Sequence, residues 1–311
     1  MSARPRTLGD RPSPSLQPGK LAPLSAWLDW AIQSYGKHGA ALGQVATTAH
    51  DEALYLLLRT LGLPLDSRPA VLKRKLTEEE AEKVEEVFRR RLQEHVPAAY
   101  LTREAFLGDL RFYVDERVII PRSYFLELLP EQIPHWLPAN KPVKRVVDVC
   151  TGSGCLAILL ARQFQEAKVD AIELSPEAAA VAKFNLASHR LAKRVKLHHS
   201  DVFDAVPPVK YDLILSNPPY VPTRELRGLP EEFKREPAMA LDGGRDGLDI
   251  IRKIFRQARG RLQPHGIVVL EVGGLRAAMD KAFPGLDLHW LHTEDGEDCV
   301  CVVQAARLLA L

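Results

Sequence analysis

Residues 211–220 read Tyr-Asp-Leu-Ile-Leu-Ser-Asn-Pro-Pro-Tyr, an apolar run with an abrupt proline-rich end. A short apolar run bounded by prolines predicts a buried strand that ends at a fixed turn. Pro218 and Pro219 restrict two φ angles and remove two backbone N–H donors. The turn should therefore present carbonyl oxygens, the Asn217 amide and the Tyr220 ring in a stiff arrangement. Such a surface suits a planar group that carries N–H donors, and the alternative is a purely structural turn.

Apolar segments alternate with helical patterns from residue 144 onward. This alternation predicts an α/β fold with a doubly wound, mainly parallel, seven-stranded sheet. The last two strands are joined by a connection too short for a helical crossover, so we expect the final strand to run antiparallel. Ligands of such sheets bind at the carboxyl ends of the strands, near the point where the strand order reverses. The predicted strands cover residues 145–149, 169–172, 195–198, 211–216, 266–272, 286–292 and 299–303.

The residues ahead of the sheet differ in composition along their length. Residues 1–22 are rich in Pro, Ser, Gly and Arg, which is typical of a disordered tail. Residues 23–95 contain three amphipathic helical patterns and are predicted to form a small helical domain. Ser25 is the expected cap of the first helix, and Thr77 with Glu80 matches a capping box at the start of the third.

A linker is predicted between the helical domain and the sheet. Residues 96–122 should form it, with a hairpin made of residues 110–114 and 117–120. Residues 123–311 then make up the sheet-containing domain.

The composition places the chain among ordinary globular proteins. It has 311 residues, of which 46% are hydrophobic and 26% charged, with a net charge of +2. This mild balance argues against a dedicated non-specific nucleic-acid binder. The four cysteines have no Cys-x-x-Cys spacing, so we expect reduced core thiols and predict no metal site. No apolar run approaches the ~18–20 residues of a membrane span, and no signal-peptide core is evident, so we expect a cytoplasmic protein without membrane contact.

A glycine-rich turn follows the first predicted strand. It runs Asp148-Val149-Cys150-Thr151-Gly152-Ser153-Gly154 and opens a helix. Glycines let the backbone approach a ligand closely. The spacing Gly-x-Gly-x-x-Ala fits the dinucleotide fingerprint, and Glu173 ends the second strand about 20 positions further on, where a ribose-binding acid is expected. The pair indicates a nucleoside-containing cofactor, and the alternative is a structural turn with an incidental surface acid.

The segment after the third predicted strand helps to distinguish the cofactors. Ser200-Asp201-Val202-Phe203 places a carboxylate where it could accept an exocyclic adenine amine, although Asp also caps turns. A nicotinamide enzyme has no evident use for an Asn-Pro-Pro-Tyr turn, and no hydride-transfer partner is apparent. Adenosyl-methionine therefore fits better. Asp148 could either bind the methionine amine or only brace the glycine turn.

Three motifs in this order carry a resemblance to a known family. Asp-x-x-Thr-Gly-Ser-Gly, Glu173-Leu174-Ser175-Pro176 and Asn-Pro-Pro-Tyr together resemble the class I, Rossmann-like methyltransferases that modify protein glutamine side chains, the HemK-like group. Cys-Thr-Gly-Ser-Gly-Cys and Pro-Arg-Ser look like the branch that methylates a glutamine of the third protein of the large ribosomal subunit. The likeness covers roughly residues 24–304 and includes residues 97–101, Phe106, residues 120–123, residues 236–241, Gly244, Asp246, Gly247 and Leu248.

The resemblance implies a function and a set of site residues. The methyl donor would be S-adenosyl-L-methionine and the acceptor the side-chain amide nitrogen, N5, of a glutamine in a large-subunit ribosomal protein, gripped by the helical domain. No direct sequence-specific nucleic-acid contact is expected. The implied catalytic residues are Asn217, Pro218, Pro219 and Tyr220. Substrate contacts would come from Phe106, Asn217, Pro218 and Tyr220, and cofactor contacts from Asp148, Cys150, Thr151, Gly152, Ser153, Gly154, Glu173, Asp201, Val202 and Asn217.

Three alternative functions remain open from the sequence. The first is glutamine methylation of peptide chain release factors, whose branch usually has Gly in place of Cys150. The second is a DNA amino-methyltransferase, which would want a target-recognition domain with a basic face. The third is a ribosome-assembly factor whose methyltransferase fold serves mainly for binding.

Overall fold

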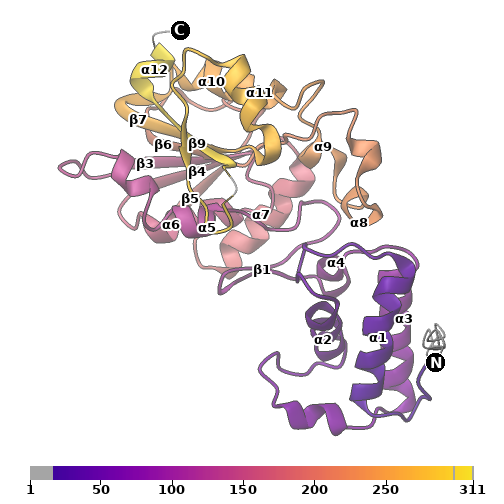
Figure 1. Ribbon diagram of the computed structural model, residues 1–311. Helices are drawn as coiled ribbons and strands as arrows, with labels where there is room; N and C mark the ends of the chain where they lie inside the picture. The colour runs from indigo at the N-terminus through magenta and orange to yellow at the C-terminus, as the bar shows by residue number, and fades with distance from the viewer. Residues whose placement is uncertain (1–16, 297, 310–311) are drawn as a thin grey trace, which may run out of the picture. The chain divides into compact units, whose positions relative to one another are not determined.

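The computed structural model describes residues 17–296 and 298–309. Of the predicted tail, residues 1–22, the first 16 residues lie outside the described residues. The chain divides into two compact units, the first ending at Thr102 and the second beginning at Arg103 (Figure 1).

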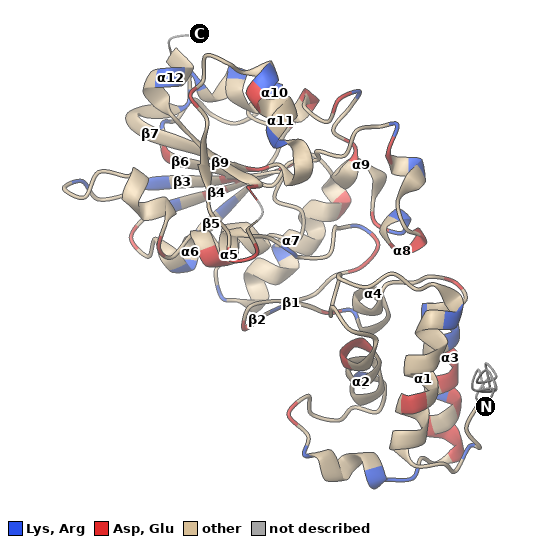
Figure 2. Ribbon diagram, in the orientation of Figure 1, with Lys and Arg blue, Asp and Glu red and all other residues tan. Residues whose placement is uncertain are grey.

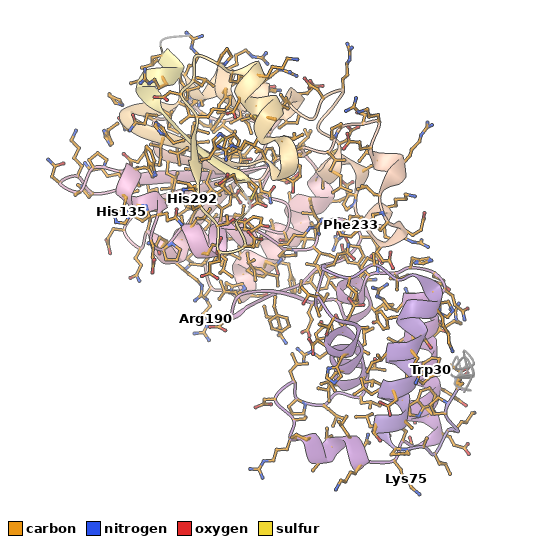
Figure 3. The ribbon with its side chains drawn as sticks, viewed as in Figure 1. Trp30, Lys75, His135, Arg190, Phe233 and His292 are labelled. Carbon is orange, nitrogen blue, oxygen red and sulfur yellow. The ribbon has the colours of Figure 1, made fainter. Side chains whose placement is uncertain are left out.

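The first unit is helical. Its core lies among the helices and includes Trp27 and Phe88, between which Trp30 packs edge-on against both rings (Figure 3). Arg91 and Glu52 form an ion pair of 2.6 Å in this core, each side chain being 1% exposed. The elements are α1 (Leu24–His38), α2 (Ala49–Thr60), η1 (Pro69–Lys73), α3 (Glu78–Leu92) and α4 (Ala98–Thr102).

Two helix caps were predicted in this unit, and one of them is confirmed. Thr77 and Glu80 form the capping box of α3. Figure 2 shows acidic residues toward the start of α3 and basic residues toward its end. These charges interact favourably with the helix dipole and so stabilise the helix. The Ser25 cap is wrong, because α1 already begins at Leu24. The Leu24 N–H donates to the Arg74 carbonyl, so a neighbouring segment satisfies that donor in place of a side-chain cap.

The hairpin near the start of the second unit differs from the prediction. β1 (Ala105–Leu107) pairs antiparallel with β2 (Leu110–Phe112). The expected pairing of residues 110–114 with residues 117–120 is therefore wrong.

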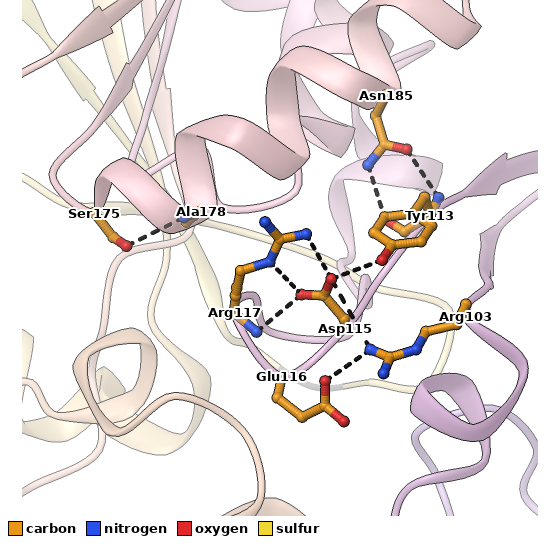
Figure 4. Close-up of polar contacts among 8 residues, drawn as sticks. All are labelled: Arg103, Tyr113, Asp115, Glu116, Arg117, Ser175, Ala178 and Asn185. Atoms are coloured by element: carbon orange, nitrogen blue, oxygen red, sulfur yellow. Dashed lines mark hydrogen bonds and ion pairs between the residues drawn. The ribbon is translucent and has the colours of Figure 1, made fainter.

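Side-chain contacts at residues 113–117 explain why the predicted hairpin does not form (Figure 4). The Asn185 amide of α7 (Pro176–Ser188) accepts from the Tyr113 N–H at 2.8 Å and donates to the Tyr113 carbonyl at 3.0 Å. Asp115 accepts from the Arg117 N–H and from its guanidinium. These contacts take up backbone groups that a strand ladder would have used.

The seven-stranded sheet has the order β5-β4-β3-β6-β7-β9-β8. All pairings are parallel except those of β9, which runs antiparallel to both β7 and β8. The doubly wound sheet with an antiparallel last strand is thus confirmed, and the strand order reverses between β3 and β6. The strands are β3 (Arg145–Val149), β4 (Lys168–Glu173), β5 (Val195–His199), β6 (Tyr211–Ser216), β7 (Leu262–Glu271), β8 (His289–Leu291) and β9 (Val300–Gln304).

Helices cover both faces of this sheet (Figure 1). α6 (Cys155–Gln163) and α7 pack on one side, and α10 (Asp249–Ala258), α11 (Arg276–Ala282) and α12 (Ala305–Leu309) on the other. Within the described residues, none of the helices has the length and apolar character needed to cross a membrane. The remaining short helices are α5 (Phe125–Leu128), η2 (Ile133–Trp136), η3 (Leu226–Gly228), α8 (Glu231–Lys234), α9 (Ala238–Leu241) and η4 (Gly273–Leu275).

Candidate active site

A cavity of about 690 Å³ lies at the carboxyl ends of the parallel strands, where ligands of such sheets bind. The segments that follow β3, β4, β5 and β6 all contribute to its wall. The structure thus brings most of the predicted site residues together. Those lining the cavity are Cys150, Thr151, Gly152, Ser153, Glu173, Asp201, Val202, Asn217, Pro218, Pro219 and Tyr220.

Three predicted site residues are missing from the described wall of the cavity. Asp148 is completely buried beneath the glycine turn. Gly154 faces α7, where an added Cβ would lie 3.3 Å from Ala182. Phe106 lies on β1 and is 38% exposed, so its role as a substrate contact stays a prediction.

The backbone of the glycine turn is unusual. Cys150, Gly152 and Gly154 have φ angles of 62°, 52° and 82°. The left-handed region costs a residue with a side chain about 1–2 kcal/mol, so Cys150 is strained, and so is Val202 with φ 53°. Strained residues of this kind concentrate at functional sites. A Cβ on Gly152 would meet only Ile119 Cγ2, at 3.8 Å, which leaves space in the cavity beside the backbone.

Asp148 braces the glycine turn from below. Its Oδ2 atom accepts from the Thr151 hydroxyl and from the Ala157 N–H, the latter at 3.0 Å. Its Oδ1 atom is buried and has no hydrogen-bond partner among the described residues. Burial raises the pKa of this carboxyl to about 7. Of the two roles left open by the sequence, the bracing contact is present, and a contact to the methionine amine stays a prediction.

Glu173 connects the end of β4 to the glycine turn. Its carboxylate accepts from the Gly152 N–H at 2.8 Å and from the Ser175 N–H at 2.9 Å. Asp201, beyond β5, lies 2.7 Å from the Lys253 ammonium. Both residues line the same cavity as the glycine turn.

Asn217 follows β6 and is held by a residue that the sequence did not point to. Its side-chain Nδ2 donates to Oε1 of Glu271, at 2.9 Å. The other oxygen of Glu271 accepts from the Ser123 hydroxyl at 2.5 Å and from the Tyr124 N–H at 3.2 Å. Burial raises the pKa of Glu271 to about 7. One feature of the sequence could have pointed to Glu271: it is the one charged residue in the predicted strand 266–272.

Three glycines make room for Tyr220. An added Cβ on Gly243 would lie 2.8 Å from the Tyr220 Cα, and one on Gly247 would lie 2.4 Å from its carbonyl oxygen. A Cβ on Gly273 would lie 2.6 Å from the ring atom Cε2. Backbone and ring of Tyr220 are thus enclosed by positions that tolerate no side chain.

An apolar wall borders the Asn-Pro-Pro-Tyr turn. Phe233 of α8 belongs to it, and its ring centroid lies 5.1 Å from the Arg122 guanidinium (Figure 3). Arg122 also donates to both oxygens of the buried Glu236 carboxylate, at 2.8 and 2.9 Å. Arg122 therefore binds the buried Glu236, and the adjacent Ser123 binds Glu271, the partner of Asn217. The wall residues are Leu229, Phe233, Pro237, Met239, Ala240 and Leu241.

Comparison with known proteins decides the family. The family described as "Methyltransferase small domain" matches residues 128–288. A ribosomal protein uL3 glutamine methyltransferase of Burkholderia pseudomallei is 45% identical over 288 residues, covering 90% of this chain and 94% of that protein. One of Bradyrhizobium diazoefficiens is 39% identical over 315 residues, covering 98% and 99%. The chain belongs to the uL3 glutamine methyltransferase family.

Membership of the uL3 glutamine methyltransferase family confirms the resemblance drawn from the sequence motifs. A second comparison concerns the fold alone. The hMettl16 catalytic domain, solved in complex with MAT2A 3′UTR hairpin 1, has a TM-score of 0.51 at 16% identity and covers 82% of this chain and 91% of that chain. The class I methyltransferase fold implied by the motif resemblance is thereby confirmed.

Proposed function

We propose that this protein transfers a methyl group from S-adenosylmethionine to the side-chain amide nitrogen of a glutamine in ribosomal protein uL3. The supporting observation is the match to uL3 glutamine methyltransferases at 39–45% identity over nearly the whole chain. The Asn-Pro-Pro-Tyr turn and the glycine turn line the same cavity, which supports a site where an acceptor amide meets a cofactor.

The residues of the cavity fit the methyl donor. S-adenosylmethionine supplies a methyl group bound to a positively charged sulfur. The open backbone at Gly152 leaves room for it, and the carboxylates of Glu173 and Asp201 would accept from its ribose hydroxyls and adenine amine. The orphaned oxygen of Asp148 adds a buried acceptor. The other contacts would come from Cys150, Thr151, Ser153, Gly154, Val202 and Asn217.

The chain's own groups would orient the acceptor. An amide nitrogen is a poor nucleophile because its lone pair is conjugated with the carbonyl. The Asn217 Oδ1 and the Pro218 carbonyl accept its two N–H bonds, Pro219 stiffens the turn, and the Tyr220 ring packs on the amide plane. Positioning of this kind supplies several kcal/mol, up to about 7–11 in the best models.

Proton transfer requires no dedicated base. Methyl transfer would form a bond between the amide nitrogen and the methyl carbon as the bond from that carbon to the donor sulfur is lost, with its electron pair left on sulfur. Carbonyl dipoles aimed at the nitrogen stabilise the positive charge that it gains. The N-methylated amide cation is acidic enough to release its proton to water.

Substrate selection is assigned to parts outside the cavity. The helical domain, residues 23–95, would grip the ribosomal protein, and the exposed Phe106 would contact it. Glutamine suits the site because its side chain reaches further than that of asparagine by one methylene. The reaction would take place in the cytoplasm, without contact to a membrane or to a specific nucleic-acid sequence.

The test is a methylation assay with three acceptors. Purified uL3, a peptide chain release factor and DNA are incubated separately with the enzyme and labelled S-adenosylmethionine, and mass spectrometry maps the label. Label on a uL3 glutamine is expected, with free uL3 a better substrate than the assembled subunit if RNA buries that glutamine. Label on the release factor alone, or on DNA alone, would reject the proposal in favour of that acceptor.

A further inference from the structure

Glu271 is a buried acid whose hydrogen bonds have an informative direction. It ends β7, next to β6, and is 4% exposed. One of its oxygens accepts from Asn217 Nδ2, and the other accepts from both the Ser123 hydroxyl and the Tyr124 N–H. An ionised carboxylate accepts and cannot donate. The NH₂ group of Asn217 must therefore face Glu271, which turns Oδ1 of Asn217 to the other side.

We propose that Glu271 is a positioning residue, which holds the side-chain amide of Asn217 in the one orientation that offers an oxygen to the substrate amide. This inference rests on the proposed function of the site. An Asn217 turned the other way would present N–H groups to the N–H groups of the substrate glutamine, so no hydrogen bond could form. Glu271 would thus decide whether Asn217 can bind the acceptor at all.

The partners of the second oxygen explain why a glutamine could not replace Glu271. The Tyr124 donor is a backbone N–H, which cannot turn into an acceptor, and the Ser123 hydroxyl donates to the same oxygen. In Glu271→Gln the new amide oxygen would stay with these two donors. Its NH₂ group would then face Asn217, which has to flip to provide an acceptor. We expect kcat to fall about 100-fold, as when a positioned polar group is lost, with the Kd for S-adenosylmethionine changed less than about twofold.

A double variant tests the direction of the hydrogen bond. In Glu271→Gln with Asn217→Asp, the new carboxylate can accept from the new NH₂ group with one oxygen and offer its other oxygen to the substrate. We expect kcat at least tenfold above that of Glu271→Gln alone. A residue that only stabilised the fold would give no such recovery, because a second substitution in the same buried site would then add to the damage.

Asp212 provides a matched control at the other end of the sheet. It is 4% exposed, and its Oδ2 accepts from two backbone N–H groups, those of Lys144 and Arg145. Its Oδ1 lies 2.9 Å from Nε2 of His265. Asp212→Asn therefore makes the same chemical change in a similar setting, far along β6 from Asn217, and should leave kcat within about twofold of wild type.

A spectroscopic measurement reads the hydrogen bond without any turnover. In ¹⁵N-labelled protein, the side-chain amide signals of Asn217 are identified by their loss in Asn217→Ala. They should shift in Glu271→Gln and not in Asp212→Asn. Unmoved signals, kcat of Glu271→Gln within threefold of wild type, or no recovery in the double variant would each overturn the inference. A wild-type enzyme that failed to methylate uL3 would instead reject the proposed function, and the amide signals would still test the role of Glu271.

Discussion

Gly273→Ala should shift the Tyr220 ring away from its position in the candidate active site. Gly273 has a φ of 51°, and a Cβ on it would lie 2.6 Å from Cε2 and 3.0 Å from Cζ of Tyr220. Ordinary van der Waals contact begins at 3.4 Å, so the ring must move back by 3.4 − 2.6, or about 0.8 Å. A displacement of about 1 Å at a positioned group can cost about 100-fold in rate, so we expect a loss of kcat approaching that size.

The same substitution should reduce stability. A side chain in the left-handed region costs about 1–2 kcal/mol, and overpacking typically adds about 1–3 kcal/mol. Alanine recovers about 0.4–1 kcal/mol by restricting the unfolded chain. The free energy of unfolding should therefore fall by about 1–5 kcal/mol, which is about 2–20 °C in Tm at about 2–4 °C per kcal/mol for a unit of this size.

Gly274 supplies the control for this experiment. It is the next residue along the chain, with a φ of −72°, and an added Cβ would meet no atom within 4 Å among the described residues. Gly274→Ala should therefore leave both kcat and Tm near wild type. Steady-state kinetics with uL3 and thermal unfolding of both variants provide the comparison. Equal kcat values for the two alanine variants would refute the account of how Tyr220 is held.

Three further predictions concern the cavity itself. Gly152→Val should abolish S-adenosylmethionine binding in calorimetry, because the branched side chain enters the space beside the glycine turn; undiminished affinity in the folded variant would contradict the cofactor site. Asn217→Ala should lower kcat about 10²–10³-fold with little change in cofactor affinity, and turnover within threefold of wild type would exclude the amide-binding role. The third prediction concerns pH, because ionised Glu271 can only accept from Asn217, whereas the protonated acid can also donate and so permit the reversed amide. Burial raises the pKa of Glu271 to about 7. In the wild type, kcat/KM should therefore rise as the pH increases through about 7, and this rise should be absent in Glu271→Gln. The raised pKa also affects folding: the contribution of Glu271 to stability should decrease as the pH increases from 4.5 to about 7. The titratable or charged groups that interact with Glu271 are Arg122, Cys155 and Tyr220.

Local patterns in the sequence carried the prediction of the sheet and of most of the cavity. The strand that ends at Asn217 and the turn around Gly152 are each specified by adjacent residues, and parallel strands bring their carboxyl ends to one edge. Knowing the strand order was therefore not necessary to place Glu173 and Asp201 in the same cavity.

The features that the sequence did not predict depend on residues far apart in the chain. Glu271 binds Ser123, which is 148 positions away, and no spacing rule connects the two. The hairpin prediction was wrong for a similar reason, because Asn185 binds the Tyr113 backbone from 72 positions away and competes with strand pairing. Ser25 matched a cap by residue type, but a neighbouring backbone satisfied the helix instead.

Three different constraints hold the Asn-Pro-Pro-Tyr turn. The prolines restrict the backbone covalently, the glycines enclose Tyr220 sterically, and Glu271 orients Asn217 electrostatically. A substrate amide offers only two N–H bonds, so its binding energy could not also order a mobile turn, since fixing one residue's backbone costs about 1–2 kcal/mol. The order must therefore be present before the substrate arrives. Substitutions that loosen any one of these devices should consequently lower kcat more than they weaken the binding of S-adenosylmethionine, because most of its proposed contacts come from residues outside this turn.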